Sequence, residues 1–255
     1  MPRGATSGLI CPICIEELRR RSVEELADAL ATPAVVPHSL EATHEVCRAC
    51  LGIRRRGDAH QRVCALAREE LALVASGWTS GRMVALRSDL RRVRPKYWEI
   101  TLPLACALVR QAQTQTMVGG AAEWVIVPVP TSAPAGRPDP MLRLALSIGE
   151  KIDVPVVAAL SRQKRRSARK SVSEVRGRIV EQEYEVSSDA AAVTNRHVIL
   201  LDDMVTTGQT LAGAARLLAN AGAEMIRPVV LDRTVSERIL QRVPRRAPEN
   251  CPHAA

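Results

Sequence analysis

Two adjacent carboxylates, Asp202 and Asp203, stand in the middle of the stretch VILLDDMVTTGQTL, which covers residues 198–211. Adjacent carboxylates can accept hydrogen bonds from the vicinal hydroxyls of a sugar and still keep lone pairs for Mg²⁺. The turn that follows is rich in hydroxyls and contains one glycine, and it consists of Thr206, Thr207, Gly208, Gln209 and Thr210. Hydroxyl donors and a backbone that permits close approach suit a phosphate. The pattern therefore predicts a ligand with a phosphate at one end and a hydroxylated ring near the acids.

Positioning these residues requires a strand before them and a helix after them. Val198–Leu201 is an uninterrupted aliphatic run, typical of a strand buried on both faces of a parallel sheet. Ligands of such sheets bind beyond the carboxyl ends of the strands, where the two acids stand. The stretch TLAGAARLLANAG, residues 210–222, predicts a helix that begins near 208–210. Free amides and the positive end of the helix dipole would face a phosphate there, and we expect a positive φ at Gly208.

Helical and strand patterns alternate along the rest of the chain. We predict helices at 65–76, 101–113 and 141–152, and strands at 124–130, 154–160, 197–201 and 225–232. This alternation, with continuous aliphatic strands, predicts an α/β fold in which a parallel sheet is flanked by helices.

Composition narrows the class of ligand. The chain has 255 residues, of which 46% are hydrophobic but only 2% are aromatic, with no Phe, so the core must be aliphatic. Few aromatic side chains also argue against base stacking on single-stranded nucleic acid. The net charge of +9 favours an anionic partner. A secretory signal and an 18-residue apolar run are both missing from the sequence, so we expect a cytoplasmic chain with no membrane segment.

Five of the seven cysteines fall within the first 65 residues, including the pairs CPIC (Cys11 and Cys14) and CRAC (Cys47 and Cys50). Two Cys-x-x-Cys pairs are the arrangement that a tetrahedral structural Zn²⁺ prefers. The 32 residues between the pairs exceed the usual gap of about 15–20, and a helix at 21–30 would account for the excess. The alternatives are reduced cysteines without a metal, or replacement of one ligand by His44 or Cys64.

These patterns divide the chain into four regions. We predict a zinc-ribbon-like module at 1–65, a helical hood and connecting region at 66–124, a core at 125–240 and a disordered tail at 241–255. Cys106 lies in an apolar helical stretch and is interpreted as a core residue.

The stretch VILLDDMVTTGQT resembles the signature of type I phosphoribosyltransferases that binds phosphoribosyl pyrophosphate (PRPP). The resemblance implies that Asp202 and Asp203 hold the ribose hydroxyls and that 206–210 wraps the 5-phosphate. It also implies a second loop for pyrophosphate, for which VIVPVPTSAPAGR is the candidate, with Pro130, Thr131, Ser132 and Arg137. The alternative is that this Pro-rich strand end only turns the chain.

The resemblance further implies the reaction. A ring nitrogen of an acceptor would displace pyrophosphate from the anomeric carbon through an oxocarbenium-like transition state, which the acids Asp202 and Asp203 stabilise by their negative charge. Mg²⁺ would neutralise the departing pyrophosphate. No nucleophilic side chain is required.

Cysteine pairs ahead of this signature resemble the ComF-like family, which is associated with competence and DNA uptake. The resemblance covers CPIC…CRAC, VIVPVP, the Arg-rich LSRQKRRSARKSVSEVRGRI and the signature. The chain departs from the family where GRPDPMLRLA replaces an Arg-Gly-aromatic-Asn run, and where PKYWE is all that matches a Lys-Tyr motif. These departures do not involve the residues of the PRPP signature, but they leave the identity of the acceptor undetermined.

Residues 162–178 carry eight Lys and Arg against Glu174 alone, which is +7 of the net +9. Their place corresponds to the mobile lid of type I phosphoribosyltransferases, where Lys164, Arg165 and Arg169 are candidates for contact with pyrophosphate. The alternatives are a solvated basic surface or contact with a nucleic-acid backbone.

Two functions of different classes follow. The first is an enzyme of nucleotide metabolism that transfers phosphoribose from PRPP to a nitrogenous base or related small-molecule acceptor. The second is a nucleic-acid-associated competence or DNA-uptake factor that binds PRPP or a nucleotide without turnover. A chain retained for its fold alone is the remaining alternative.

Overall fold

The structure is a computed structural model, and it describes residues 44–55, 57, 64–75, 78–80, 96–114, 123–131, 139–162 and 184–235. The elements in chain order are β1 (His44–Val46), β2 (Ile53–Arg55), α5 (Ala65–Arg68), β3 (Val74–Ala75), β4 (Trp78–Ser80), α7 (Lys96–Thr114), β5 (Trp124–Pro128), α8 (Pro140–Ile152), β6 (Leu160–Arg162), β7 (Tyr184–Val186), the 3₁₀ helix η1 (Ser188–Val193), β8 (His197–Val205), α10 (Gln209–Asn220) and β9 (Met225–Val235).

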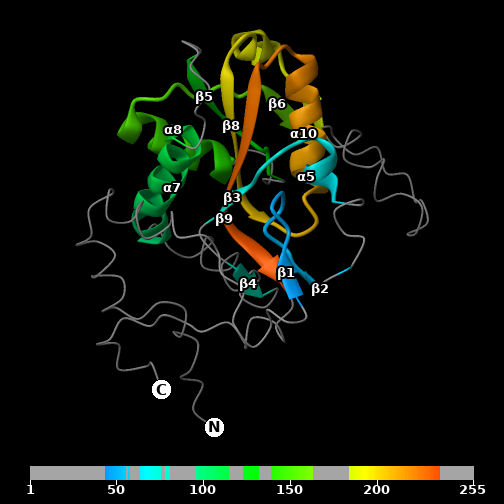
Figure 1. The fold of residues 1–255 in the computed structure, drawn as a ribbon. Helices are drawn as coiled ribbons and strands as arrows, with labels where there is room; N and C mark the ends of the chain where they lie inside the picture. The colour runs from blue at the N-terminus through cyan, green and yellow to red at the C-terminus, as the bar shows by residue number, and fades with distance from the viewer. Residues whose placement is uncertain are drawn as a thin grey trace, which may run out of the picture.

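A parallel sheet forms the centre, with strand order β3-β9-β8-β5 and with β4 also paired to β9. Two long strands, β8 and β9, run side by side through its middle (Figure 1). Helices α7 and α8 lie on one face, and α10 and α5 lie on the other (Figure 1). The predicted fold class, a parallel sheet flanked by helices, is confirmed.

The aliphatic run of β8 explains this layering, because successive strand residues point to opposite faces. Val198 and Leu200 pack in one core cluster with Leu211 and Leu218 of α10. Their neighbours in the strand pack in the other cluster, with the helices α7 and α8. Each of the four residues Val198–Leu201 is fully buried, so the strand requires an apolar side chain at every position.

Helix α8 follows from its sequence in the same way. Asp139 caps its amino end by accepting a hydrogen bond from the Met141 amide at 2.7 Å, and Pro140 occupies the first turn, where its missing N–H costs nothing. The buried side chains Met141, Leu144 and Ile148 recur at helical spacing and face the sheet.

Two sequence predictions need correction. The helix predicted over 65–76 ends at Arg68, and the chain then enters β3, where Val74 pairs with Val229. Pairing with the central sheet here outweighs local helix propensity. The strand predicted over 154–160 makes a single bridge, between Val156 and Ile126, and the ladder of β6 begins at Leu160.

The signature strand is also longer than predicted, since β8 runs to Val205 instead of ending near Leu201. The helices predicted at 101–113 and 141–152 are present as α7 and α8. The expected helix at 21–30, the pair Cys11 and Cys14, and the expected disordered tail lie outside the described residues.

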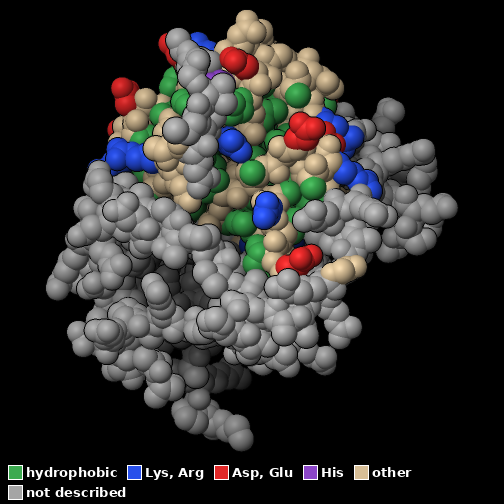
Figure 2. Space-filling view, in the orientation of Figure 1, with side chains coloured by type: hydrophobic (Ala, Val, Ile, Leu, Met, Phe, Trp, Pro, Cys, Tyr) green, Lys and Arg blue, Asp and Glu red, His purple; other side chains and the backbone are tan. Residues whose placement is uncertain are grey.

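Within the parts of the chain that the structure describes, no helix combines the length and apolar character that a membrane crossing needs. On the face drawn in Figure 2, the described Lys and Arg side chains are scattered among acidic and apolar ones. Apart from Arg162, the basic segment 162–178 lies outside the described residues.

Candidate functional site

Asp202 and Asp203 extend beyond the neighbouring strand. The last residue of β5, Pro128, pairs with Leu201, and the Val129 amide then donates to the Leu201 carbonyl at 2.8 Å. Strand β8 continues past this point, and among the described strands it pairs there with β9 alone. Both acids are half-buried, and the Asp203 amide donates to Oδ1 of Asp202 at 2.8 Å. The acids therefore stand at the carboxyl edge of the sheet, as the sequence predicts, although they belong to β8 itself.

A tight turn links β8 to α10 and ends on Gly208. This glycine is the N-cap of α10, with φ 80° and ψ 1°, so the expected positive φ and the expected helix start are both confirmed. The first helical hydrogen bond runs from the Ala212 amide to the Gly208 carbonyl at 2.9 Å. The amides of Gln209, Thr210 and Leu211 therefore precede the helical ladder. Together with the helix dipole they make the turn suitable for an anion.

The hydroxyl side chains of this turn differ in their surroundings. Thr206 and Thr207 are exposed, and Thr210 is half-buried on the first turn of α10. The Thr207 hydroxyl accepts a hydrogen bond from the Gln209 amide at 3.4 Å. The turn thus presents hydroxyls and amides together at the amino end of α10.

Gly208 is required for a second reason, which is its contact with α5. A Cβ atom at this position would lie 2.9 Å from Cγ of Leu66. Leu66 is fully buried, so it has little room to move away. The turn is therefore packed directly against the helix that follows Cys64.

The back of the turn is held by Arg233 and Thr234 of β9, which the sequence analysis did not identify. Nη1 of Arg233 donates to the carbonyl oxygens of Val205, at 2.9 Å, and Thr206. The Thr234 hydroxyl lies 2.6 Å from the Val205 carbonyl oxygen and 2.9 Å from the Thr206 hydroxyl. Arg233 is only 2% exposed. Arg is rarely buried without partners, so an arginine within an apolar strand was the sequence feature that could have indicated its role.

The second predicted loop is closed at its base by Asp139. Oδ2 of Asp139 accepts from the Thr131 amide at 2.7 Å, and Oδ1 lies 3.1 Å from the Thr131 hydroxyl. The same carboxylate caps α8, so one side chain fixes both ends of the loop. Pro130 is half-buried beside it, and Ser132 and Arg137 lie outside the described residues.

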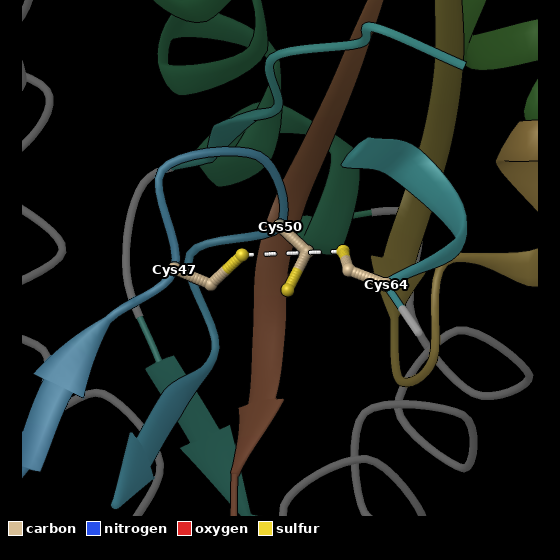
Figure 3. A group of neighbouring side chains, drawn as sticks. All are labelled: Cys47, Cys50 and Cys64. Atoms are coloured by element: carbon tan, nitrogen blue, oxygen red, sulfur yellow. Dashed lines mark hydrogen bonds between the residues drawn. The ribbon is translucent and has the colours of Figure 1, made fainter. Parts of the chain in front are cut away.

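Three buried thiols, Cys47, Cys50 and Cys64, point toward one another (Figure 3). Their sulfur atoms all lie within 4.8 Å of one another, and those of Cys47 and Cys64 are 3.9 Å apart. Cys47 and Cys50 come from the turn between β1 and β2, and Cys64 is the N-cap of α5. The three are close enough to bind a metal ion. Cys64 was an alternative ligand in the sequence analysis, and the structure places it in the group.

Burial and hydrogen bonds act on these thiols in opposite directions. Burial raises the pKa of Cys50 to about 11. Burial also acts to raise the pKa of Cys47, but hydrogen bonds from the Cys50 and Ala49 amides and from neighbouring thiols outweigh it, so this pKa is lowered. Cys47 therefore loses its proton more readily than its burial alone would allow.

Comparison with known proteins agrees with this geometry. Residues 122–243 match the family model described as a phosphoribosyl transferase domain. Over 42 residues the chain is 45% identical to an adenine phosphoribosyltransferase of Mycobacteroides abscessus, a stretch that covers 16% of this chain and 24% of that protein. The chain therefore spans about a quarter of the curated relative that it matches.

Solved structures with similarity include an adenine phosphoribosyltransferase, with a TM-score of 0.36 and 10% identity over 59% of this chain and 78% of the other. A hypoxanthine phosphoribosyltransferase from Staphylococcus aureus gives a TM-score of 0.36 and 13% identity over 55% of this chain and 76% of the other. Residues 122–243, which carry the acid pair, the glycine turn and Arg233, thus match the phosphoribosyl transferase domain in sequence, and the sheet and helices around them have the type I phosphoribosyltransferase fold.

Proposed function

We propose that this chain binds PRPP and transfers its phosphoribosyl group to a nitrogenous base or related acceptor, with release of pyrophosphate. One observation carries the proposal. The acids Asp202 and Asp203 stand half-buried near the carboxyl end of β8, and a few residues later the chain makes a glycine turn at the amino end of α10. A carboxylate pair next to an anion-binding turn matches a sugar that carries a phosphate.

The 5-phosphate would bind the turn. Amides at the start of α10, the positive end of its dipole and the hydroxyls of Thr206, Thr207 and Thr210 would all face the phosphate oxygens. Arg233 supports this role from behind, because it ties the carbonyls of Val205 and Thr206 into the protein. Those carbonyls are thereby kept from a phosphate that they would repel.

The ribose hydroxyls would donate to Asp202 and Asp203. Carboxylate oxygens are also the ligands that Mg²⁺ prefers, so this pair fits a magnesium ion bound together with PRPP. When bound, Mg²⁺ would neutralise part of the charge on pyrophosphate.

In the reaction, the lone pair of an acceptor nitrogen forms the bond to the anomeric carbon. The bond from that carbon to pyrophosphate breaks, and its electrons leave with pyrophosphate. Asp202 and Asp203 would stabilise the positive charge that develops on the ring. Because the acceptor supplies the nucleophile, no side chain need attack.

Two loops would serve the pyrophosphate. The first is 130–139, whose base is fixed by the hydrogen bonds between Thr131 and Asp139. The second is the basic segment 162–178, which leaves the core at β6 and returns at β7. These strands pair antiparallel, with Arg162 opposite Tyr184, so the segment starts and ends at one place. A basic segment whose flanking strands pair with each other is suited to act as a lid.

The test is calorimetric titration of the full chain with PRPP, with and without Mg²⁺. Asp202→Asn and Asp203→Asn should each weaken binding by about tenfold or more, since hydrogen bonds to charged groups contribute roughly 1.5–3 kcal/mol. Asp153→Asn is the matched control, because Asp153 ends α8 at the opposite edge of the sheet with φ 57°, a conformation that Asn tolerates. Equal affinity for PRPP in all variants would refute the site. Transfer is tested separately, by measuring release of pyrophosphate in the presence of a panel of bases.

A second candidate is a nucleic-acid-associated factor that binds PRPP or a nucleotide without turnover, as the ComF-like resemblance implies. Its support is the +7 charge of residues 162–178 in the sequence, and the thiol group ahead of the transferase domain. Affinity for duplex DNA should fall steeply as salt is added, because bound cations are released from the backbone. A flat salt response would exclude this candidate.

A further inference from the structure

We infer that Arg233 and Thr234 of β9 are positioning residues of the phosphate site, which act through the backbone of the turn and do not touch the ligand. They hold the carbonyls of Val205 and Thr206 toward β9, and they thereby turn the amides of Thr206 and Thr207 toward the phosphate. Their effect on the affinity for a sugar phosphate rests on the function proposed above, whereas their effect on the direction of the amides does not.

The register of the two central strands places Arg233 behind the turn. The ladder between β8 and β9 ends with the pair Val205 and Arg233, and Val205 is also the last residue of β8. Arg233 therefore stands beside the point where the strand becomes the turn. Its side chain is almost fully buried, whereas that of Thr234 is half-buried.

Two carbonyls at the start of the turn accept hydrogen bonds from these side chains. Nη1 of Arg233 donates to the carbonyl oxygens of Val205 and Thr206. The Thr234 hydroxyl lies 2.6 Å from the same Val205 oxygen. A hydrogen bond from a charged donor is roughly twice as strong as one between neutral groups, so Arg233 supplies the larger part of the restraint and Thr234 a smaller part.

The direction of these carbonyls determines the direction of two amides. A peptide group is planar and trans, so its N–H points away from its C=O. The Val205 carbonyl shares a peptide group with the Thr206 amide, and the Thr206 carbonyl shares one with the Thr207 amide. Both carbonyls face β9, so both amides face away from it, and neither amide donates a hydrogen bond within the described ranges. Successive amides with a common direction form an anion-binding concavity.

The guanidinium group is itself held from two sides. Nη2 of Arg233 donates to Sγ of Cys50 at 3.9 Å, while Nη1 donates to the carbonyls of the turn. Because the group is planar and rigid, contacts at both ends prevent it from rotating away from the carbonyls. A lysine has a single point charge on a flexible stem, so Arg233→Lys would keep the charge and lose the contact at both ends.

A through-space attraction between the charge of Arg233 and the phosphate is the competing explanation. The two explanations differ for Arg233→Lys, because attraction survives a change that keeps the charge and positioning does not. They also differ for Thr234, which carries no charge and yet bonds to the same carbonyl as Arg233. An effect of the Thr234 hydroxyl on phosphate affinity therefore indicates positioning.

The first test is calorimetric titration of the full chain with ribose 5-phosphate and with pyrophosphate. Thr234→Val keeps the shape of the side chain and removes the hydroxyl, and it should weaken the affinity for ribose 5-phosphate about threefold to tenfold. Thr234→Ser restores the hydroxyl and should bind nearly as tightly as the wild type. Pyrophosphate lacks the 5-phosphate, so its affinity should stay the same in both variants.

Two outcomes of this titration would overturn the positioning role. One is an affinity for ribose 5-phosphate in Thr234→Val equal to that of the wild type. The other is an equal loss for ribose 5-phosphate and for pyrophosphate, because a general loss of structure weakens both ligands alike.

The second test is the same titration of Arg233→Lys, which should bind ribose 5-phosphate about tenfold or more weakly. Arg227→Lys is the matched control, because Arg227 is a half-buried arginine of the same strand near its amino end, away from the turn. Wild-type affinity in Arg233→Lys would overturn positioning in favour of attraction by charge. If Arg233→Lys does not fold, the two Thr234 variants decide.

Nuclear magnetic resonance separates the direction of the amides from the proposed ligand. Inorganic phosphate should shift the amide signals of Thr206 and Thr207 in the wild type and in Thr234→Ser, and should shift them less in Thr234→Val. This result without any affinity for PRPP would refute the proposed ligand and support the positioning role. PRPP affinity and amide shifts that are unchanged in Thr234→Val would refute positioning and leave the ligand standing. Absence of amide shifts in the wild type with both phosphate and PRPP would overturn both.

Discussion

Gly208 and Leu66 are in contact so close that a single added carbon would not fit. A Cβ atom on Gly208 would lie 2.9 Å from Cγ of Leu66, and the glycine has a φ of 80°. Contacts of Cβ below about 3 Å are essentially never seen in proteins, so either residue would have to shift. The strand–turn–helix unit of the proposed phosphate site is therefore fitted to α5 at this one point.

Gly208→Ala should destabilise the protein and weaken PRPP binding together. The left-handed backbone alone costs about 1–2 kcal/mol for a residue with a side chain, and the contact with Leu66 adds to it. Denaturant unfolding and PRPP titration measure the two effects.

Leu66→Ala provides the control for this prediction. Leu66→Ala relieves the contact but not the backbone strain. Gly208→Ala should therefore lower the free energy of unfolding less in the Leu66→Ala background than in the wild type, but should still lower it. Strict additivity of the two changes would show that Leu66 does not limit the turn.

The local parts of this site could be predicted from sequence. Val198–Leu201, the acids and Gly208 stand next to one another in the chain, so periodicity and turn chemistry define them. Arg233 could not be assigned in this way, because its place opposite Val205 depends on the register of β9 against β8. A register is a property of two strands, and a single stretch does not reveal it.

The same reasoning explains the errors in the fold. The stretch 65–76 is rich in Ala, Leu and Glu, which favour a helix, yet Val74 pairs with Val229 and becomes part of the sheet. Pro155 cannot donate to a ladder, and the chain around it makes only the bridge at Val156. Cys64 joins Cys47 and Cys50 because α5 packs on α10, which is a tertiary contact.

Asp139→Ala should loosen the loop at 130–139 and destabilise α8. The change removes the N-cap, which contributes about 1 kcal/mol, and both bonds to Thr131. Asp139→Asn keeps one acceptor oxygen and should lose less. Urea unfolding should therefore rank the free energies of unfolding as wild type, Asn variant and then Ala variant, and an Ala variant as stable as the wild type would contradict the role of Asp139.

Cys106 should make the stability of the protein depend on alkaline pH. Burial raises its pKa from 9.0 to about 11. Since the folded pKa is the higher one, the neutral thiol stabilises the fold fully below about pH 9, and this contribution is lost as pH rises through about 11. At about 1.4 kcal/mol per pKa unit, the loss is at most about 2–3 kcal/mol.

The measurement is the difference in unfolding free energy between wild type and Cys106→Ala at several pH values from 8 to 11. Other groups titrate alike in both proteins and cancel in the difference. A difference that stays constant over this range would show that the Cys106 thiol ionises as easily in the folded chain as in the unfolded one.

The basic segment should act through particular residues if it is a lid, and through charge alone if it is a solvated surface. Lys164, Arg165 and Arg169 are the candidates for pyrophosphate, and replacing all three by Ala should weaken pyrophosphate binding while inorganic phosphate binds as before. Replacing Lys170, Arg176 and Arg178 removes the same charge from the same segment. Long-range attraction depends on total charge. Equal losses of affinity in the two triple variants would therefore favour a general electrostatic effect over direct contact. The measurement is titration of each variant with pyrophosphate and with phosphate at two salt concentrations, because salt weakens the long-range attraction.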